Sequence, residues 1–138
     1  MVLAFHARSA TNDIDADVYP PEKVLEAADV VAGQLGLPRG WLNNDAKIFL
    51  PLTSTIRWAP VFHLDSLEVV AADEPTMLAM KLRASRGRRD EGDIEFLVKR
   101  LGLSTEDQIV ELYDSYFPED PLSARARQII RSVVKHHT

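Results

Sequence analysis

Residues 13–35 read DIDADVYPPEKVLEAADVVAGQL, and this stretch decides how the chain folds. In its first seven residues, three aspartates alternate strictly with apolar residues, which predicts a half-buried strand with an acidic face. Pro21 then suits the first turn of a helix, and apolar residues recur at helical spacing up to Leu35. Gly36 supplies the stop signal. The stretch therefore predicts a strand followed directly by an amphipathic helix.

The rest of the chain divides into a part with short strands and a part with helical periodicity. The expected elements are a short helix over 41–46, two or three short strands at 48–50, 61–64 and 67–70, and helices over 73–85, 90–102, 104–116 and from 120 onward. Asp73 and Asp90 are expected to be N-caps, and Ser104 with Asp107 resembles a capping box. We expect one α/β domain over residues 1–138, of the α+β kind, with a small mixed sheet in 1–72 and a helical part in 73–138.

Composition excludes several classes of protein. The 138 residues and 46% hydrophobic content fit one globular domain. The chain has no cysteine, which excludes a disulfide scaffold, a thiolate zinc site and a cysteine nucleophile, and favours a cytoplasmic location. No apolar run approaches the length of a membrane span, and the N-terminus lacks the pattern of a signal peptide. The four histidines show no ligand spacing, and no serine hydrolase motif is present.

Charge is distributed unevenly along the chain. Residues 1–75 carry 11 acidic and 5 basic residues, a net of −6, whereas residues 76–138 carry 10 acidic and 11 basic residues, a net of +1. The acidic part favours a divalent cation over nucleic acid as its ligand. The basic residues gather at Lys81, Arg83, Arg86, Arg88 and Arg89, and at Arg125, Arg127, Arg131 and Lys135. Each group is either an anion-binding face or a solvated helix face.

Asp13 and Asp15 are the first candidates for chemistry. Two residues apart on a strand, they project from the same side at a spacing of about 7 Å. Like charges held so close repel each other unless a cation lies between them or water surrounds them. Mg²⁺ prefers a few carboxylates together with substrate phosphates, so the pair is either a magnesium site or an exposed acidic strand face.

The context of these aspartates resembles a known family. Arg8, Thr11, Asp13, Ile14 and Asp15 resemble the core motif of the nucleotidyltransferase superfamily. The run is most similar to the bacterial subgroup related to the toxins of type IV toxin–antitoxin systems of the abortive-infection kind.

A second segment extends the resemblance. Residues 78–84, with Lys81, followed by 89–94, with Asp90 and Asp93, resemble the family's lysine-bearing helix that leads into an Arg-Asp-x-x-Asp element. From the residues alone, Lys81 either extends to solvent or meets an anion, and the two aspartates fit the start of a helix without any catalytic role.

The resemblance implies a sheet of the nucleotidyltransferase type and a Mg²⁺-dependent reaction that moves a nucleoside monophosphate from a nucleoside triphosphate to a hydroxyl. The acceptor would be RNA, tRNA or a protein, and an antitoxin protein is a possible partner. The implied catalytic residues are Asp13, Asp15, Lys81 and Asp93. The implied metal ligands are Asp13 and Asp15, with Glu68 or Asp65 as the third carboxylate. The implied nucleotide and phosphate ligands are Arg8, Thr11, Lys81 and Asp90.

One part of the family pattern is missing from this sequence. Superfamily members carry a Gly-Gly or Gly-Ser turn about a dozen residues before the first aspartate, and its backbone amides hold the nucleotide phosphates. Met1 lies only 12 residues before Asp13, and no glycine precedes Gly33. We therefore expect an N-terminally short member of the family. The alternative function is a catalytically incomplete nucleotidyltransferase-fold module with a binding or regulatory role.

Overall fold

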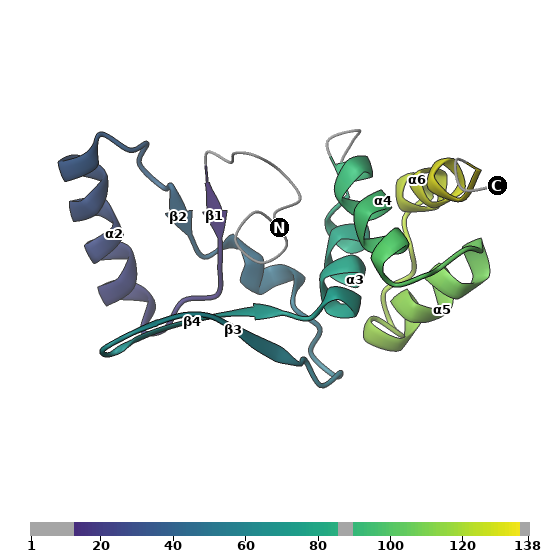
Figure 1. Ribbon diagram of the computed structural model, residues 1–138, viewed down its shortest axis with the longest axis horizontal. Coiled ribbons are helices and arrows are strands. Elements are labelled where there is room, and N and C mark those ends of the chain that lie inside the picture. Colours follow the sequence, from purple (N-terminus) through teal and green to yellow (C-terminus); the bar gives the residue numbers. More distant parts are fainter. Residues whose placement is uncertain (1–12, 86–89, 136–138) are drawn as a thin grey trace. The chain divides into compact units, whose positions relative to one another are not determined.

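The computed structural model of the chain describes residues 13–85 and 90–135 (Figure 1). Over these residues the chain divides into two compact units, residues 13–50 and residues 51–135. The first unit contains two short strands, an α-helix and a 3₁₀-helix, and the second contains a β-hairpin and four α-helices. The single domain expected over residues 1–138 stays a prediction.

The first unit begins with the predicted strand and helix. Strand β1 (Ile14–Asp15) pairs in parallel with β2 (Leu42–Asn43), and helix α2 (Pro21–Leu35) lies between them in sequence. The helix ends where it was expected to end, because Gly36 adopts a left-handed conformation with φ of 67°. The prediction of a strand over 13–19 is right in position but too long, since only two of its residues join the ladder.

Residues 41–50 fold differently from the prediction. The expected helix over 41–46 and the expected strand over 48–50 are both wrong, because this segment holds β2 and the 3₁₀-helix η1 (Asp45–Phe49). Hydrogen bonds to residues distant in sequence hold this segment in its conformation. The Trp41 indole Nε1 donates to the Ala28 carbonyl at 2.9 Å, and the Val18 amide donates to Asn44 Oδ1 at 3.0 Å. These bonds tie the segment to α2 and to the chain after β1.

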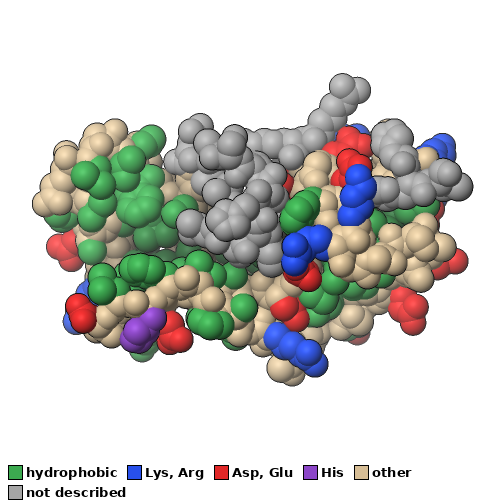
Figure 2. Space-filling model, viewed as in Figure 1, with side chains coloured by type: hydrophobic (Ala, Val, Ile, Leu, Met, Phe, Trp, Pro, Cys, Tyr) green, Lys and Arg blue, Asp and Glu red, His purple; other side chains and the backbone are tan. Residues whose placement is uncertain are grey.

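The second unit begins with an antiparallel hairpin. Strand β3 (Trp58–Leu64) pairs with β4 (Leu67–Ala72), which confirms the strands expected at 61–64 and 67–70. Asp65 makes the turn with a positive φ of 47°, a conformation that aspartate tolerates better than most residues. Every residue of β3 is exposed, and Figure 2 shows hydrophobic side chains at the surface over this hairpin.

Four helices complete the second unit: α3 (Glu74–Ala84), α4 (Glu91–Arg100), α5 (Glu106–Tyr116) and α6 (Ala124–Lys135). Their apolar stripes face inward and form the main core, because residues at i, i+3, i+4 and i+7 share one side of a helix. The core residues include Leu78, Leu82, Ile94, Leu97, Val98, Ile109, Tyr113, Ile129, Ile130 and Val133, each at most 2% exposed. This packing of α3 against α4 positions the candidate site described below.

The helix starts show which predicted caps were right. Asp73 caps α3 as expected, because its carboxylate accepts a hydrogen bond from the Thr76 amide at 3.1 Å. The capping box of α5 is one residue away from the predicted pair: it consists of Thr105 and Gln108, not Ser104 and Asp107.

Of the two remaining helix starts, that of α6 differs from the prediction and that of α4 agrees with it in position. Helix α6 begins at Ala124 and not at Asp120, because the Ser123 hydroxyl accepts a bond from the Ala126 amide at 3.0 Å. Asp90 occupies the N-cap of α4 as expected, although its side chain makes no capping hydrogen bond.

The fold is therefore α+β, with a helical part after residue 73 as expected. The strands of the described residues form two two-stranded sheets, one parallel and one antiparallel, and not the one small mixed sheet that we expected. None of the helices in the described ranges is long and apolar enough to span a membrane.

Candidate functional site

Lys81, Asp90 and Asp93 lie together where α3 packs against α4. The Lys81 ammonium Nζ is 2.9 Å from Asp93 Oδ2 and 3.9 Å from Asp90 Oδ1. The Asp93 side chain is only 4% exposed, whereas Lys81 and Asp90 are 26% and 22% exposed. One ammonium and two carboxylates give these three groups a formal charge of −1. The Lys81–Asp93 pair is thus shielded on its carboxylate side and open to solvent on its ammonium side.

The sequence explains why these groups meet. Lys81 follows the buried Leu78 by three positions on α3, so its aliphatic stem runs beside the core while its charged end reaches outward. Asp93 lies in the first turn of α4, where unpaired backbone amides favour a negative charge. Both the lysine and the start of the helix therefore stabilise a carboxylate that is otherwise costly to bury.

Asp13 directly precedes β1 in the first unit, and Asp15 is the last residue of that strand. Both side chains are exposed, while Ile14 between them is half-buried, so the alternation predicted from the sequence is confirmed. Asp15 Oδ1 accepts a hydrogen bond from the Asn43 amide Nδ2 at 2.8 Å, and Asn43 Oδ1 accepts one from the Asp45 backbone N–H at 2.9 Å. The neighbouring strand thereby orients the Asp15 carboxylate.

The two candidates for a third carboxylate lie on the hairpin of the second unit. Glu68 is exposed on β4 and faces His63 across the strand pair, and Asp65 makes the hairpin turn. A strand directly beside β1 was expected to supply this carboxylate. In the described part of the chain, β1 pairs with β2 and β4 pairs with β3. The choice between Glu68 and Asp65 stays open.

The predicted site residues therefore fall into groups. Lys81, Asp90 and Asp93 are brought together within the second unit, whereas Asp15 ends strand β1 of the first unit and Asp13 directly precedes that strand. Arg8 and Thr11 lie outside the described residues, as do Arg86, Arg88 and Arg89 of the first basic group.

The chemistry of Asp13 and Asp15 fits a hard cation such as Mg²⁺. Carboxylate oxygens are its preferred protein ligands, and a site with two of them leaves room for waters and substrate phosphates. Within residues 13–85 and 90–135, no three histidine, aspartate or glutamate side chains gather closely enough to form a complete metal cage. The pair would hold the ion in partnership with a phosphate ligand.

Two features of these surfaces were not predicted from the sequence. Asn43 had no predicted role, since its contact with Asp15 joins segments 28 positions apart. A pocket between α4 and α6 contains Arg125, which belongs to a predicted basic group, and Glu91, which had no predicted role. The i, i+3, i+4, i+7 spacing of polar and apolar residues on α6 was the available signal for that pocket.

These elements define an α+β protein with an ion-paired helical site and an acidic strand. Comparison with known proteins finds no match to the chain among family models, curated proteins or solved structures.

Proposed function

We propose that this chain is a Mg²⁺-dependent nucleotidyltransferase that moves a nucleoside monophosphate from a nucleoside triphosphate to a hydroxyl of RNA, tRNA or a protein. The observation that carries the proposal is the Lys81–Asp93 contact at 2.9 Å, with Asp90 beside it. The resemblance to the superfamily implies that Lys81, Asp90 and Asp93 belong to one site. The short distance between these side chains supports that expectation.

In this proposal, Asp13 and Asp15 are the residues that would hold Mg²⁺, and the ion would supply charge neutralisation for a triphosphate. Lys81 has three N–H donors, and one of them faces Asp93. The other N–H donors of this partly exposed ammonium bind a phosphate oxygen. Asp93 holds the ammonium in place, and the resemblance implies that Asp90, Arg8 and Thr11 would each contribute to nucleotide binding.

The proposed transfer forms a bond between the acceptor oxygen and the α-phosphorus and breaks the bond to pyrophosphate. A carboxylate takes the proton of the acceptor hydroxyl, and Glu68 and Asp65 are the alternatives for this role. A reaction of this kind depends on positioning and charge neutralisation and needs no covalent intermediate. We place it in the cytoplasm, with an antitoxin protein as a possible regulator.

The experiment is a label-transfer assay. Each of the four nucleoside triphosphates, labelled at the α-phosphate, is incubated with Mg²⁺, the protein, and either total tRNA or a protein extract. We expect one nucleotide to label one pool with the wild-type chain, and the label to disappear with Asp13→Asn/Asp15→Asn. Asp107→Asn, which changes an exposed acidic residue of α5, should keep the activity. Absence of label with every nucleotide and both pools would contradict the proposed activity.

A second candidate function is a non-catalytic module that binds a nucleotide or a partner. The observation that favours it is the same cluster, because two carboxylates already balance Lys81 and such a pair stabilises two packed helices without any ligand. Mg²⁺-dependent nucleotide binding without label transfer would favour this second function.

A further inference from the structure

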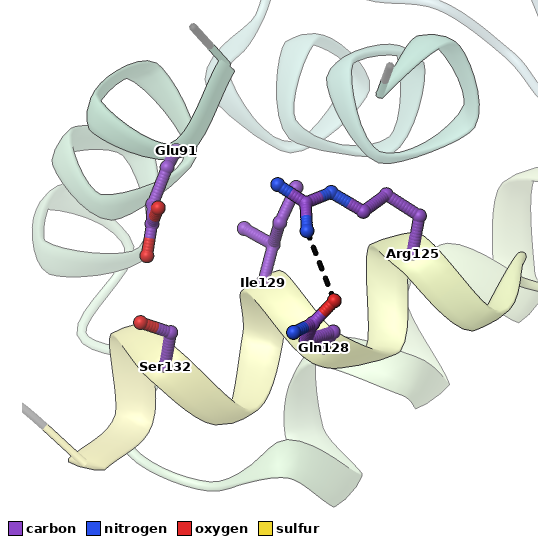
Figure 3. Close-up of a pocket in the computed structure, with 5 residues that line it drawn as sticks. All are labelled: Glu91, Arg125, Gln128, Ile129 and Ser132. Atoms are coloured by element: carbon purple, nitrogen blue, oxygen red, sulfur yellow. Dashed lines mark hydrogen bonds between the residues drawn. The ribbon is translucent and has the colours of Figure 1, made fainter. Parts of the chain in front are cut away.

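A pocket of about 380 Å³ lies between α4 and α6 of the second unit (Figure 3). Its walls come from Glu91 on α4 and from Arg125, Gln128, Ile129 and Ser132 on α6. The four α6 residues stand at i, i+3, i+4 and i+7, so one face of that helix lines the pocket. The volume is within the range of pockets that bind small metabolites.

This pocket lies on another side of α4 from the candidate nucleotide site. Glu91 and Asp93 are two positions apart, and two helical steps turn the side chain by roughly 200°. Asp93 points toward Lys81 on α3, whereas Glu91 lines the pocket beside α6. Glu91 and Asp93 therefore lie on opposite sides of the same turn of α4.

One part of the pocket is cationic. Arg125 Nη1 donates a hydrogen bond to Gln128 Oε1 at 2.9 Å, which holds the guanidinium across the helix surface (Figure 3). A guanidinium has five N–H donors, so this bond leaves donors for a ligand. No carboxylate of the described residues forms an ion pair with Arg125. Its charge is therefore available to an anionic group.

The other part of the pocket is anionic, and the floor between them is apolar. Glu91 makes no hydrogen bond or ion pair with any residue in the described ranges, and Figure 3 shows its carboxylate directed toward the Ser132 side of the pocket. Ile129, which is 2% exposed, forms the floor. Although Glu91 and Arg125 carry opposite charges, no ion pair joins them.

We propose that this pocket binds a small zwitterion, with a carboxylate on Arg125 and an ammonium group near Glu91. A simple anion would satisfy Arg125 but would be repelled by Glu91, and a simple cation would face the reverse penalty. A molecule with both charges and a short apolar middle complements both ends and the Ile129 floor. Free amino acids and ω-amino acids belong to this class.

The test uses nuclear magnetic resonance of the ¹⁵N-labelled full chain. The probes are β-alanine, 4-aminobutyrate and 6-aminohexanoate, each compared with the carboxylate and the amine of equal length. We expect at least one zwitterion to shift the amides of Glu91 and Ile129 and to bind at least about tenfold more tightly than either single-charge control. Glu91→Gln and Arg125→Gln should each weaken this binding about fivefold or more.

Two control variants test whether weaker binding is specific to substitutions in the pocket. Glu111→Gln on α5 and Arg127→Gln on α6 change the same residue types outside the pocket lining, and both should bind the zwitterion as the wild type does. Amide shifts elsewhere in the spectrum report whether each variant keeps its fold. The proposal is overturned if no zwitterion shifts these amides at tens of millimolar, or if the single-charge controls bind equally well.

Discussion

The Lys81 ammonium lies 2.9 Å from a carboxylate of Asp93 that is 96% shielded from solvent, as its 4% exposed side chain indicates. A buried carboxylate without a close positive charge costs several kcal/mol, and the lysine offsets this cost. The pair joins α3 to α4, so it contributes to the packing of the second unit. Stability and the proposed chemistry therefore depend on the same two residues.

The first prediction concerns removal of one partner of this pair. Lys81→Met keeps the aliphatic stem but removes the ammonium beside Asp93, and we expect a loss of about 2–3 kcal/mol in the free energy of unfolding. Lys81→Met/Asp93→Leu removes both charges and should recover at least half of that loss. Urea denaturation measures both values. Lys99→Met, which removes an exposed pair with Glu95, should cost no more than about 0.5 kcal/mol. Equal losses for Lys81→Met and Lys99→Met would show that burial of Asp93 does not matter.

The second prediction concerns pH. Burial raises the pKa of the Tyr113 phenol above its ordinary value of 10.0, and the Asp120 carboxylate adds to the rise. Since the folded pKa lies above the unfolded one, the stability that this neutral phenol contributes is complete below about pH 10 and is lost as pH rises through the folded pKa.

Tyr113→Phe tests this dependence because it keeps the ring that packs against Phe117 at 5.3 Å between centroids. We expect the free energy of unfolding to fall less steeply in the variant than in the wild type between about pH 9 and pH 11. Other groups that ionise in this range are common to both chains and cancel in the comparison. Identical slopes would mean that the phenol ionises in the folded protein as it does in the unfolded one.

The third prediction concerns the start of α5. The Thr105 hydroxyl oxygen accepts a hydrogen bond from the Gln108 backbone N–H, and Gln108 Oε1 accepts one from the Thr105 backbone N–H. Thr105→Ala should cost about 1 kcal/mol of unfolding free energy. Ser104→Ala removes one long hydroxyl contact to the same glutamine and should cost less than half as much. Thermal denaturation of the two variants decides whether the capping box begins at Thr105 or one residue earlier.

The fourth prediction sets two glycines of the first unit against each other. Gly33 lies inside α2 with open space around it, so Gly33→Ala should stabilise the helix by about 0.5–1 kcal/mol. Gly36 also has open space around it, but its φ is 67°. Gly36→Ala should therefore destabilise by about 1 kcal/mol through backbone strain alone. Hydrogen exchange of the α2 amides measures both effects, and a change of the same sign at the two positions would contradict the account.

The helices and the hairpin could be predicted from the sequence because their signals are local. Gly36 ends α2 and Asp73 caps α3 through contacts within a few residues, and the apolar runs that form β3 and β4 are separated by a short turn. The same locality explains the smaller error at α5, where two neighbouring polar pairs offer similar caps and only side-chain geometry decides between Ser104 and Thr105.

The segment around β2 could not be predicted, because contacts distant in sequence decide it. Trp41 bonds to the Ala28 carbonyl and Asn43 bonds to Asp15, and neither contact leaves a periodic pattern in residues 41–50. Contacts at the candidate site and the pocket likewise divide into one that could be predicted and one that could not. The resemblance to a family motif predicted that Lys81 and Asp93 act together, whereas Glu91 and Arg125 meet at one pocket only because α4 packs against α6.

The measurement that tests the central claim most directly is calorimetric titration of each nucleoside triphosphate, with and without Mg²⁺, into the wild-type chain, Asp13→Asn/Asp15→Asn, Lys81→Gln and the control Lys99→Gln. We predict Mg²⁺-dependent binding of at least one nucleotide to the wild type and to Lys99→Gln, and a loss of about tenfold or more in affinity in each of the two site variants. Absence of binding by all four nucleotides, or equal binding by the wild type and both site variants, would contradict the proposed nucleotide site.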